Sequence, residues 1–270
     1  MTRIRILAYH AVRNTPAGSA ANLFTISPQV LREHIRVLRR ARFNFITGGQ
    51  LADAFAGTGD LPPRPLLMTF DDGYADLVHT TGPILAEFGV PAVAFIVTDL
   101  IGQQSSWDTT TVDSVHPLCT AEELGEVRRF AIEIGAHSCT HRRLTRLSDD
   151  EIVREVVGSR DKLGALGLGV PQLFAFPYGD HDARIRDAVR SAGYSAALTT
   201  YAGRARLTDD RFQVPRLLVL NHHRGARFRA LVELSGCIND MRASRAGRTL
   251  SAARARLLPR SRTAIRMRTP

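Results

Sequence analysis

Segments that predict β-strands alternate with segments that predict helices about seven times along this chain of 270 residues, a pattern typical of α/β proteins with a parallel sheet. Short apolar runs rich in β-branched and aromatic residues, such as 91–97 (PAVAFIV), predict buried strands. Two of the intervening helices open with a capping box, for example Ser148-x-x-Glu151. This number of units within about 235 residues favours a closed barrel over a doubly wound sheet.

The individual elements are expected at defined places. Strands are predicted at 3–9, 65–70, 91–97, 131–136, 172–176, 194–199 and 212–220. Helices are predicted at 28–41, 75–88, 120–130, 148–166, 181–192 and 225–235. The polar segment 102–117 interrupts the alternation and predicts a loop over one end of the scaffold. Pro215 weakens the prediction for the first half of the last strand, because proline cannot donate to a sheet ladder.

The positive charge of the chain is concentrated at one end. The chain has 36 Lys+Arg and 26 Asp+Glu, a net charge of +10. Residues 241–270 hold nine Arg and neither an acidic nor an aromatic residue, so residues 1–240 have 27 cationic and 26 acidic side chains. We therefore predict a near-neutral folded domain over 1–240 and a basic, disordered tail over 241–270. Nucleic-acid binding is not expected without stacking aromatics, and the tail makes at most peripheral contact with a membrane surface.

Several classes of protein are excluded by what the sequence lacks. No run of 18 apolar residues is present, so no membrane-spanning helix is expected. The first residues contain no long apolar stretch and no small-residue cleavage site, which predicts a cytoplasmic location. The three cysteines, Cys119, Cys139 and Cys237, are too few and too scattered for a disulfide framework.

Polar clusters follow directly after five of the predicted strands. These clusters are Tyr9-His10, Asp71-Asp72-Gly73, the HSCTH segment at 137–141, Pro177-Tyr178-Gly179 and His222-His223. In a βα barrel the carboxyl ends of the strands share one rim, and active sites are built there. The sequence therefore predicts an active site made from these five clusters.

Two of the clusters together have the composition of a metal site. His137 and His141 are four residues apart and can present both imidazoles to one ion. A carboxylate from Asp71 or Asp72 supplies a third ligand and leaves a position open for water, as a catalytic zinc site requires. The other aspartate is then free to act as a general base. An HxxxH pair or an Asp-Asp-Gly turn means little alone, but their joint occurrence after strands favours a metallohydrolase.

Three motifs resemble those of the polysaccharide deacetylases, also called the NodB-homology or carbohydrate esterase 4 family. They are TFDDGY at 69–74, HSCTH at 137–141 and FAFPYG at 174–179. The resemblance covers about residues 4–220. It implies a distorted (β/α)7 barrel of the NodB-homology type and metal-dependent removal of acetyl groups from N-acetylated amino sugars.

The resemblance also implies roles for individual residues. Asp71 is the expected general base. Asp72, His137 and His141 are the expected ligands of a divalent metal, usually Zn²⁺, with Co²⁺ or others as alternatives. The backbone N–H of Tyr178 is expected to help hold the oxyanion of the tetrahedral intermediate, where a fixed donor stabilises developing charge.

The sequence departs from the family pattern at two catalytic positions. Many members have an arginine where this chain has Ala175, so Arg216 is a candidate for the guanidinium that orients Asp71, the alternative being a surface arginine. The late motif with its general-acid histidine is matched only loosely by Leu220-Asn221-His222-His223. Of the two histidines we favour His222 as the acid that protonates the leaving amine.

Three further residues are candidates for substrate binding. His10 is expected at the rim near the metal, or else as a structural histidine. Trp107 can stack on a sugar ring, or pack the insertion that contains it. Pro177 belongs to the third motif and is expected beside the substrate.

The function predicted from these observations is hydrolysis of the N-acetyl group of an N-acetylamino sugar with release of acetate. The substrate is an oligo- or polysaccharide, a glycolipid or a glycosylated metabolite. Two alternatives stay open: a related C–N hydrolase acting on a small non-sugar amide or imide, and a non-catalytic carbohydrate-binding module. No nucleic-acid partner is expected.

Overall fold

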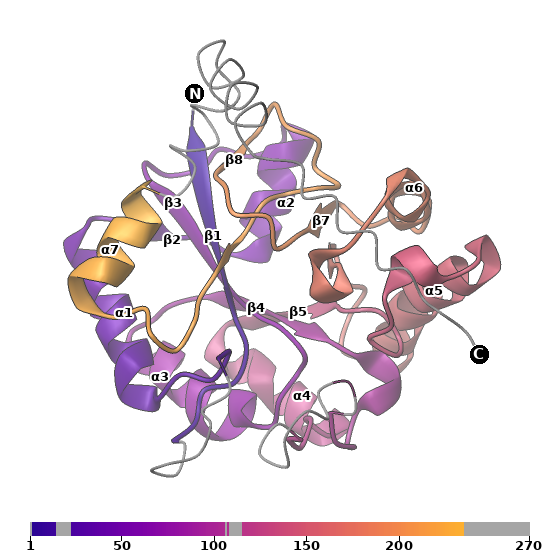
Figure 1. The fold of residues 1–270 in the computed structure, drawn as a ribbon, viewed down its shortest axis with the longest axis horizontal. Coiled ribbons are helices and arrows are strands. Elements are labelled where there is room, and N and C mark those ends of the chain that lie inside the picture. Colours follow the sequence, from indigo (N-terminus) through magenta and orange to yellow (C-terminus); the bar gives the residue numbers. More distant parts are fainter. Residues whose placement is uncertain (1, 15–22, 106, 108–114, 235–270) are drawn as a thin grey trace, which may run out of the picture.

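A single curled sheet of nine strands forms the centre of the part of the chain that the structure describes (Figure 1). This computed structural model describes residues 2–14, 23–105, 107 and 115–234. The strands are β1 (Arg3–Tyr9), β2 (Asn44–Phe45), β3 (Pro65–Phe70), β4 (Ala92–Ile96), β5 (Ile132–Ala136), β6 (Leu173–Ala175), β7 (Ala196–Leu198), β8 (Ala205–Arg206) and β9 (Leu217–Leu218). Their order is β7-β6-β5-β4-β3-β1-β8, with β2 paired to β3 and β9 paired to β1. Only the β1–β8 pair among them is antiparallel.

The segment that ends in β9 connects the β7 end of the sheet to β1. Val214 N donates to the carbonyl oxygen of Ala197, within β7, at 2.8 Å. Four residues later, Leu218 of β9 is paired in parallel with Ala8 of β1. One short stretch of chain thus pairs with β7 on one side and with β1 on the other. The predicted α/β class with a distorted, barrel-like sheet is confirmed.

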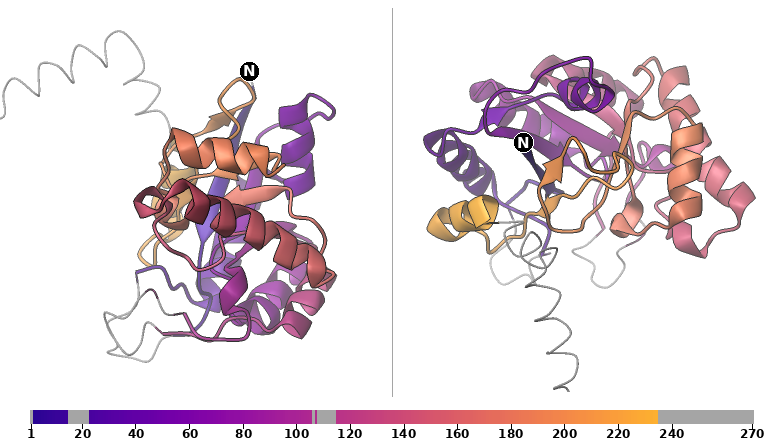
Figure 2. Two further views of the ribbon diagram at one scale, coloured as in Figure 1. Left: turned by 90° about the vertical axis from the view of Figure 1, so that its right-hand side faces the viewer. Right: turned by 90° about the horizontal axis from the view of Figure 1, so that it is seen from above.

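Seven α-helices lie around the outside of the strands in the described residues (Figures 1 and 2). They are α1 (Pro28–Arg40), α2 (Gly48–Ala56), α3 (Gly82–Glu87), α4 (Ala121–Val127), α5 (Asp149–Ala165), α6 (Ala183–Ser191) and α7 (Gly225–Leu234). The predicted N-terminal signals are present: Ser27 caps α1, and capping boxes open α4 and α5. No helix of the described residues is long and apolar enough to cross a membrane.

Several elements differ from the sequence prediction. The two-residue strands β2 and β8 were not predicted. Helix α2 was not predicted, because its first residues are Gly48 and Gly49, although Thr47 and Gln50 form a capping box. The helix predicted over 75–88 is a π-helical turn, Leu77–Thr81, followed by α3. The strand predicted over 212–220 is reduced to β9, since Pro215 interrupts the ladder. The predicted tail at 241–270 lies outside the described residues.

Side chains of the strands point alternately to two hydrophobic clusters. Leu66, Met68 and Phe70 of β3 face the helices, whereas Leu67 faces the interior of the curled sheet. Phe95 of β4 also lies in the interior cluster and is fully buried. Both faces of β3 and β4 are covered, which explains why their sequences are almost continuously apolar rather than alternating.

The interior cluster predicts a large stability loss on truncation of Phe95. We expect Phe95→Ala to lower the free energy of unfolding by about 3–5 kcal/mol, because the removed ring leaves a cavity. Val153→Ala on the outer face of α5, where Val153 is 49% exposed, is the matched control and is expected to change it by less than about 0.5 kcal/mol. Urea denaturation measures both; a Phe95→Ala protein as stable as the control contradicts the packing described.

Candidate active site

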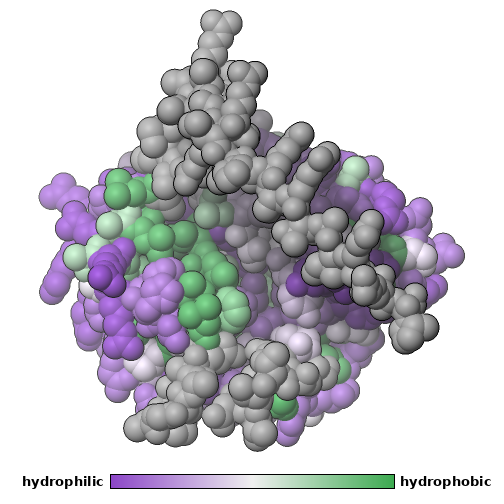
Figure 3. Space-filling view, in the orientation of Figure 1, coloured by the Kyte–Doolittle hydropathy of each residue, from purple (hydrophilic) through white to green (hydrophobic). Residues whose placement is uncertain are grey.

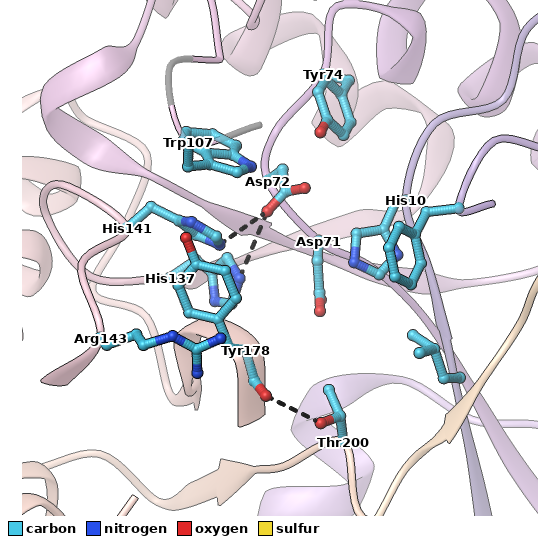
Figure 4. Close-up of a pocket in the computed structure, with 12 residues that line it drawn as sticks. His10, Asp71, Asp72, Tyr74, Trp107, His137, His141, Arg143, Tyr178 and Thr200 are labelled. Atoms are coloured by element: carbon cyan, nitrogen blue, oxygen red, sulfur yellow. Dashed lines mark hydrogen bonds and ion pairs between the residues drawn. The ribbon is translucent and has the colours of Figure 1, made fainter. Parts of the chain in front are cut away.

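A pocket of about 440 Å³ opens at the carboxyl ends of the parallel strands (Figure 4). Each of the main strands is followed by a side chain that reaches it. The pocket is lined by His10, Phe24, Asp71, Asp72, Tyr74, Trp107, His137, His141, Arg143, Tyr178, Thr200 and Leu218. Four of the five predicted clusters contribute to this pocket, all except His222-His223, and they bring acidic, imidazole and aromatic side chains together.

A sharp turn after β3 sends the two aspartates in different directions. Asp72 and Gly73 both have positive φ, 77° and 78°, a conformation that costs an ordinary residue free energy. In Figure 4 the carboxylate of Asp72 points to the two imidazoles, whereas that of Asp71 points away from them. The turn thereby gives two neighbouring carboxylates two separate environments.

Asp71 is held by a two-pronged ion pair with Arg216. Arg216 Nη1 and Nη2 donate to the two carboxylate oxygens, each at 2.7 Å. Arg216 is completely buried and also donates to Thr69 Oγ1 and to Thr199 O. Of the two placements that the sequence left open for this arginine, the structure has the one against Asp71.

The ion pair determines the charge of Asp71. Burial raises the pKa of this carboxyl group, but the charges of Arg216 and His137 and the hydrogen bonds from Arg216 outweigh burial and lower the pKa to about 2. Asp71 is therefore a carboxylate at neutral pH. Its orientation is fixed as well, because both oxygens are engaged by one rigid guanidinium.

Asp72, His137 and His141 form a compact set of possible metal ligands. Asp72 Oδ1 lies 3.5 Å from His137 Nε2 and 3.4 Å from His141 Nε2. One ligand atom from each residue lies within 4.8 Å of the other two, and all three side chains are buried. Tetrahedral zinc at about 2.0–2.2 Å from its ligands places neighbouring ligands about 3.4 Å apart. The donor types and two of their separations fit a zinc site.

The two imidazoles are prepared for metal binding by their surroundings. His137 Nδ1 lies 2.7 Å from Ala175 O, so Nδ1 carries the proton and Nε2 faces the triad. The His141 ring is packed between Trp107 and Tyr178, with centroids at 4.2 Å and 4.7 Å. Burial lowers the pKa of both histidines, which keeps the rings in the neutral form that binds metals.

The loop that carries His141 is anchored by a residue that the sequence analysis did not identify. Glu155 of α5, buried, accepts hydrogen bonds from the backbone N–H groups of Cys139 and Thr140, both at 2.9 Å. Its second oxygen accepts from the Thr140 hydroxyl. The loop needs this support because Ser138 and His141 both have positive φ. The sequence offered one indication of this role, a glutamate on the apolar face of the helix predicted at 148–166.

Tyr178 lies on a turn that only a glycine can complete. Tyr178 has a φ of 59°, and its carbonyl accepts a hydrogen bond from Thr200 Oγ1 at 3.2 Å. The next residue, Gly179, has a φ of 70°, and a Cβ there would lie 2.0 Å from Thr200 Oγ1. The close approach of these two segments places the Tyr178 ring against His141 at the edge of the pocket.

The remaining predicted residues fall into two groups. His10 lines the pocket at the expected rim. Trp107 also lines it, and it packs both on His141 and against the small cluster of Ala11, Tyr74 and Leu118. Pro177 is buried behind Tyr178 and does not line the pocket. His222 is exposed on the turn after β9, and neither it nor His223 lines the pocket. The assignment of the proton donor to His222 finds no support in this placement and stays a prediction.

Comparison with known proteins agrees with the site. A family model described as polysaccharide deacetylase matches residues 58–197, which include the three motifs. The chain belongs to the polysaccharide deacetylase family. The matched region runs from the segment before β3 to the end of the β6–β7 unit and holds the Asp-His-His triad of this deacetylase-family protein.

Individual relatives are distant in sequence and close in fold. Protein YxkH of Bacillus subtilis is 22% identical over 231 residues, which are 86% of this chain and 76% of YxkH. The poly-β-1,6-N-acetyl-D-glucosamine N-deacetylase of Escherichia coli is 22% identical over 248 residues, and the match spans only 36% of that protein. The solved deacetylase PplD of Streptococcus pyogenes, in complex with acetate, superposes with a TM-score of 0.75 at 19% identity and covers 86% of this chain and 98% of PplD. A de-N-acetylase of Aggregatibacter actinomycetemcomitans gives 0.73 at 21% identity, covering 85% and 99%.

The hydrogen bonds from Glu155 to the loop that carries His141 lead to a prediction about metal affinity. Glu155→Ala leaves two buried N–H groups without their acceptor, so the loop loosens and zinc affinity is expected to fall about 10–100-fold. Glu126→Ala, an exposed glutamate on α4, is the matched control and is expected to bind zinc like the wild type. Competition with a chromophoric chelator measures the affinity, and circular dichroism checks the fold. Wild-type affinity in a folded Glu155→Ala protein contradicts the role of this anchor.

Proposed function

We propose that this protein is a metal-dependent hydrolase that removes the N-acetyl group from an N-acetylamino sugar and releases acetate. The observation that carries the proposal is the pairing of two carboxylates with different tasks at one pocket. Asp71 is ionised and oriented by Arg216, and Asp72 stands beside His137 and His141. The E. coli relative, named for deacetylation of a poly-N-acetylglucosamine, supports the substrate class.

Asp72, His137 and His141 are the residues that would hold the metal, Zn²⁺ in the first instance, with Co²⁺ or other divalent ions as alternatives. When bound, such an ion supplies Lewis acidity toward the amide oxygen and the attacking water. The buried, neutral imidazoles and the single carboxylate make a set of three protein ligands, which leaves room for water and substrate. The fit of the residues, rather than a bound ion, supports this part of the proposal.

Asp71 acts as the general base in this proposal. The carboxylate accepts a proton from the water that attacks the amide carbonyl, using an oxygen lone pair not engaged by Arg216. The guanidinium keeps the carboxylate in one orientation, so its distance to the attacking water does not depend on a flexible side chain. The backbone N–H of Tyr178 is the proposed donor to the oxygen on which negative charge develops.

His10 is the proposed donor of the proton that the leaving amine takes up. It lines the pocket, and its Nδ1 is buried with no hydrogen-bond partner among the described residues. Burial lowers the pKa of His10 to about 4, against the opposite effect of the charge on Asp71. The ring is therefore neutral in the empty pocket and first has to take up a proton. In this proposal it receives the proton that Asp71 removes from the attacking water, and as imidazolium it passes that proton to the leaving amine. Trp107 and Tyr178 provide aromatic surface for a sugar ring.

The role of Asp71 is tested by Asp71→Asn. The amide keeps the shape of the side chain but cannot take up a proton, so kcat is expected to fall about 10²–10⁴-fold. Zinc binding is expected to persist because Asp72, His137 and His141 are untouched. Acetate release from N-acetylated oligosaccharides with added zinc, together with a zinc titration, measures the two properties. An Asp71→Asn protein with full activity sinks the proposed mechanism.

The proton donor is tested by comparing two histidines. His10→Gln is expected to lower kcat about 10²-fold, whereas His222→Gln, on the exposed turn, is expected to keep kcat within about twofold of the wild type. Both variants are assayed for acetate release on the same substrate. The reverse order of effects rejects His10 as the donor and returns the role to His222, as the sequence predicts.

A further inference from the structure

A second hollow, of about 330 Å³, adjoins the metal pocket and is lined mainly by arginines. Its lining residues are Arg142, Arg143, Arg146, Leu147 and Tyr178, and we name it the arginine hollow. Arg143 and Tyr178 also line the pocket that contains the Asp-His-His triad. The two cavities therefore adjoin each other at these two side chains.

The local chain explains why the guanidinium groups gather there. The segment after His141 ends in a 3-10 turn, Leu144–Arg146, in which Leu144 is fully buried. Leu147, also buried, follows at once. With these two leucines turned into the core, the arginines on either side are left at the surface. Arg143 precedes this turn and Arg146 ends it, and both line the hollow.

The arginine hollow carries more positive than negative charge. Arg142 pairs with Glu151 at 3.2 Å and Arg143 with Asp180 at 3.6 Å, both on half-exposed side chains. Within the described residues Arg146 makes no ion pair. Exposed pairs of this kind are worth less than about 1 kcal/mol, so they can rearrange around a bound anion. Neither acidic partner lines the hollow.

The position of Arg143 connects this charge to the reaction site. Its guanidinium lies 4.2 Å from the centre of the Tyr178 ring, and that ring packs against His141 (Figure 4). Figure 3 shows that the side of the molecule carrying α5 and α6 is mainly hydrophilic, while hydrophobic residues gather over β1 and α7. Arg143 lines both cavities, so its positive charge stands where the two adjoin.

From this geometry we infer that the substrate is an N-acetylamino sugar carrying an anionic group, a phosphate or a carboxylate, which binds in the arginine hollow. Guanidinium groups match both anions through paired N–H donors. The inference rests on the proposed function, because it places the acetamido group in the adjacent metal pocket. The near-zero net charge of residues 1–240 is compatible with an anionic substrate, because the anion would be bound by this local cluster of arginines and not by the overall charge.

The test measures binding separately from turnover. Zinc-loaded Asp71→Asn protein and, in parallel, wild-type protein kept metal-free with a chelator are each titrated by calorimetry with three ligands: neutral di-N-acetylchitobiose, its 1-phosphate, and an N-acetylglucosamine–glucuronic acid disaccharide. The second protein keeps the Arg216–Asp71 pair and therefore tests the inference even if the variant is unstable. We expect at least one anionic ligand to bind about tenfold more tightly than the neutral one. The preference should shrink when salt is raised from 50 to 300 mM, about the range in which surface charges become screened. Phosphate and carboxylate are distinguished by which of the two anionic ligands gains.

Arg146→Gln, added to the same protein, is expected to reduce the ratio of anionic to neutral affinity about fivefold or more. Arg40→Gln removes the same charge from the exposed last turn of α1 and is expected to leave the ratio unchanged. Equal binding of all three ligands, or an equal effect of both substitutions, overturns the inference. Acetate release by the wild-type protein is measured in parallel: release without anionic preference rejects the hollow alone, and anionic preference without release rejects the proposed function alone.

Discussion

The contact between Arg216 and Asp71 is the interaction on which the rest of the structure depends. A guanidinium that is completely buried must be paired, because an isolated charge inside a protein costs several kcal/mol. Asp71 supplies the countercharge, and Thr69 and Thr199 accept further hydrogen bonds. Arg216 lies in the stretch that pairs with β7 and then with β1. The same contact therefore joins the two sides of the sheet and fixes the proposed base.

The turn at Asp72 and Gly73 separates two chemical tasks within two residues. Adjacent carboxylates in one environment would compete for the same cation and repel each other. Here Asp71 faces a buried guanidinium, while Asp72 faces two imidazoles. The unfavourable backbone of the turn is stabilised by the strands around it, which is the usual arrangement at functional sites. In the loop that carries His141, hydrogen bonds to Glu155 stabilise the unfavourable backbone of Ser138 and His141 in a similar way.

The sequence could predict what depends on local pattern. Continuous apolar runs located the central strands, and the motifs at 69–74 and 137–141 located the triad. Helix α2 was missed because it begins with two glycines, which disfavour a helix. The length of β9 was overestimated because the apolar run around Pro215 is buried where it passes from β7 to β1 and is not one continuous strand. Glu155 acts through its contact with another segment, and the arginine hollow is completed by Tyr178, which is distant in sequence from its arginines. A single sequence carries no measure of such contacts. The same limit applied to His10 and His222, which only the fold could distinguish.

The shortness of β9 has a consequence for how the proposed active site opens. The stretch from Val214 to Leu218 is held by few ladder hydrogen bonds, whereas β1, β3, β4 and β5 are joined by longer pairings. Segments with few cross-links open locally at lower free energy than the body of a protein. We therefore expect local opening of this stretch to separate Arg216 from Asp71 while β3 and β5, which precede Asp72 and His137, stay paired. The proposed base then loses its orientation before the candidate ligand set comes apart.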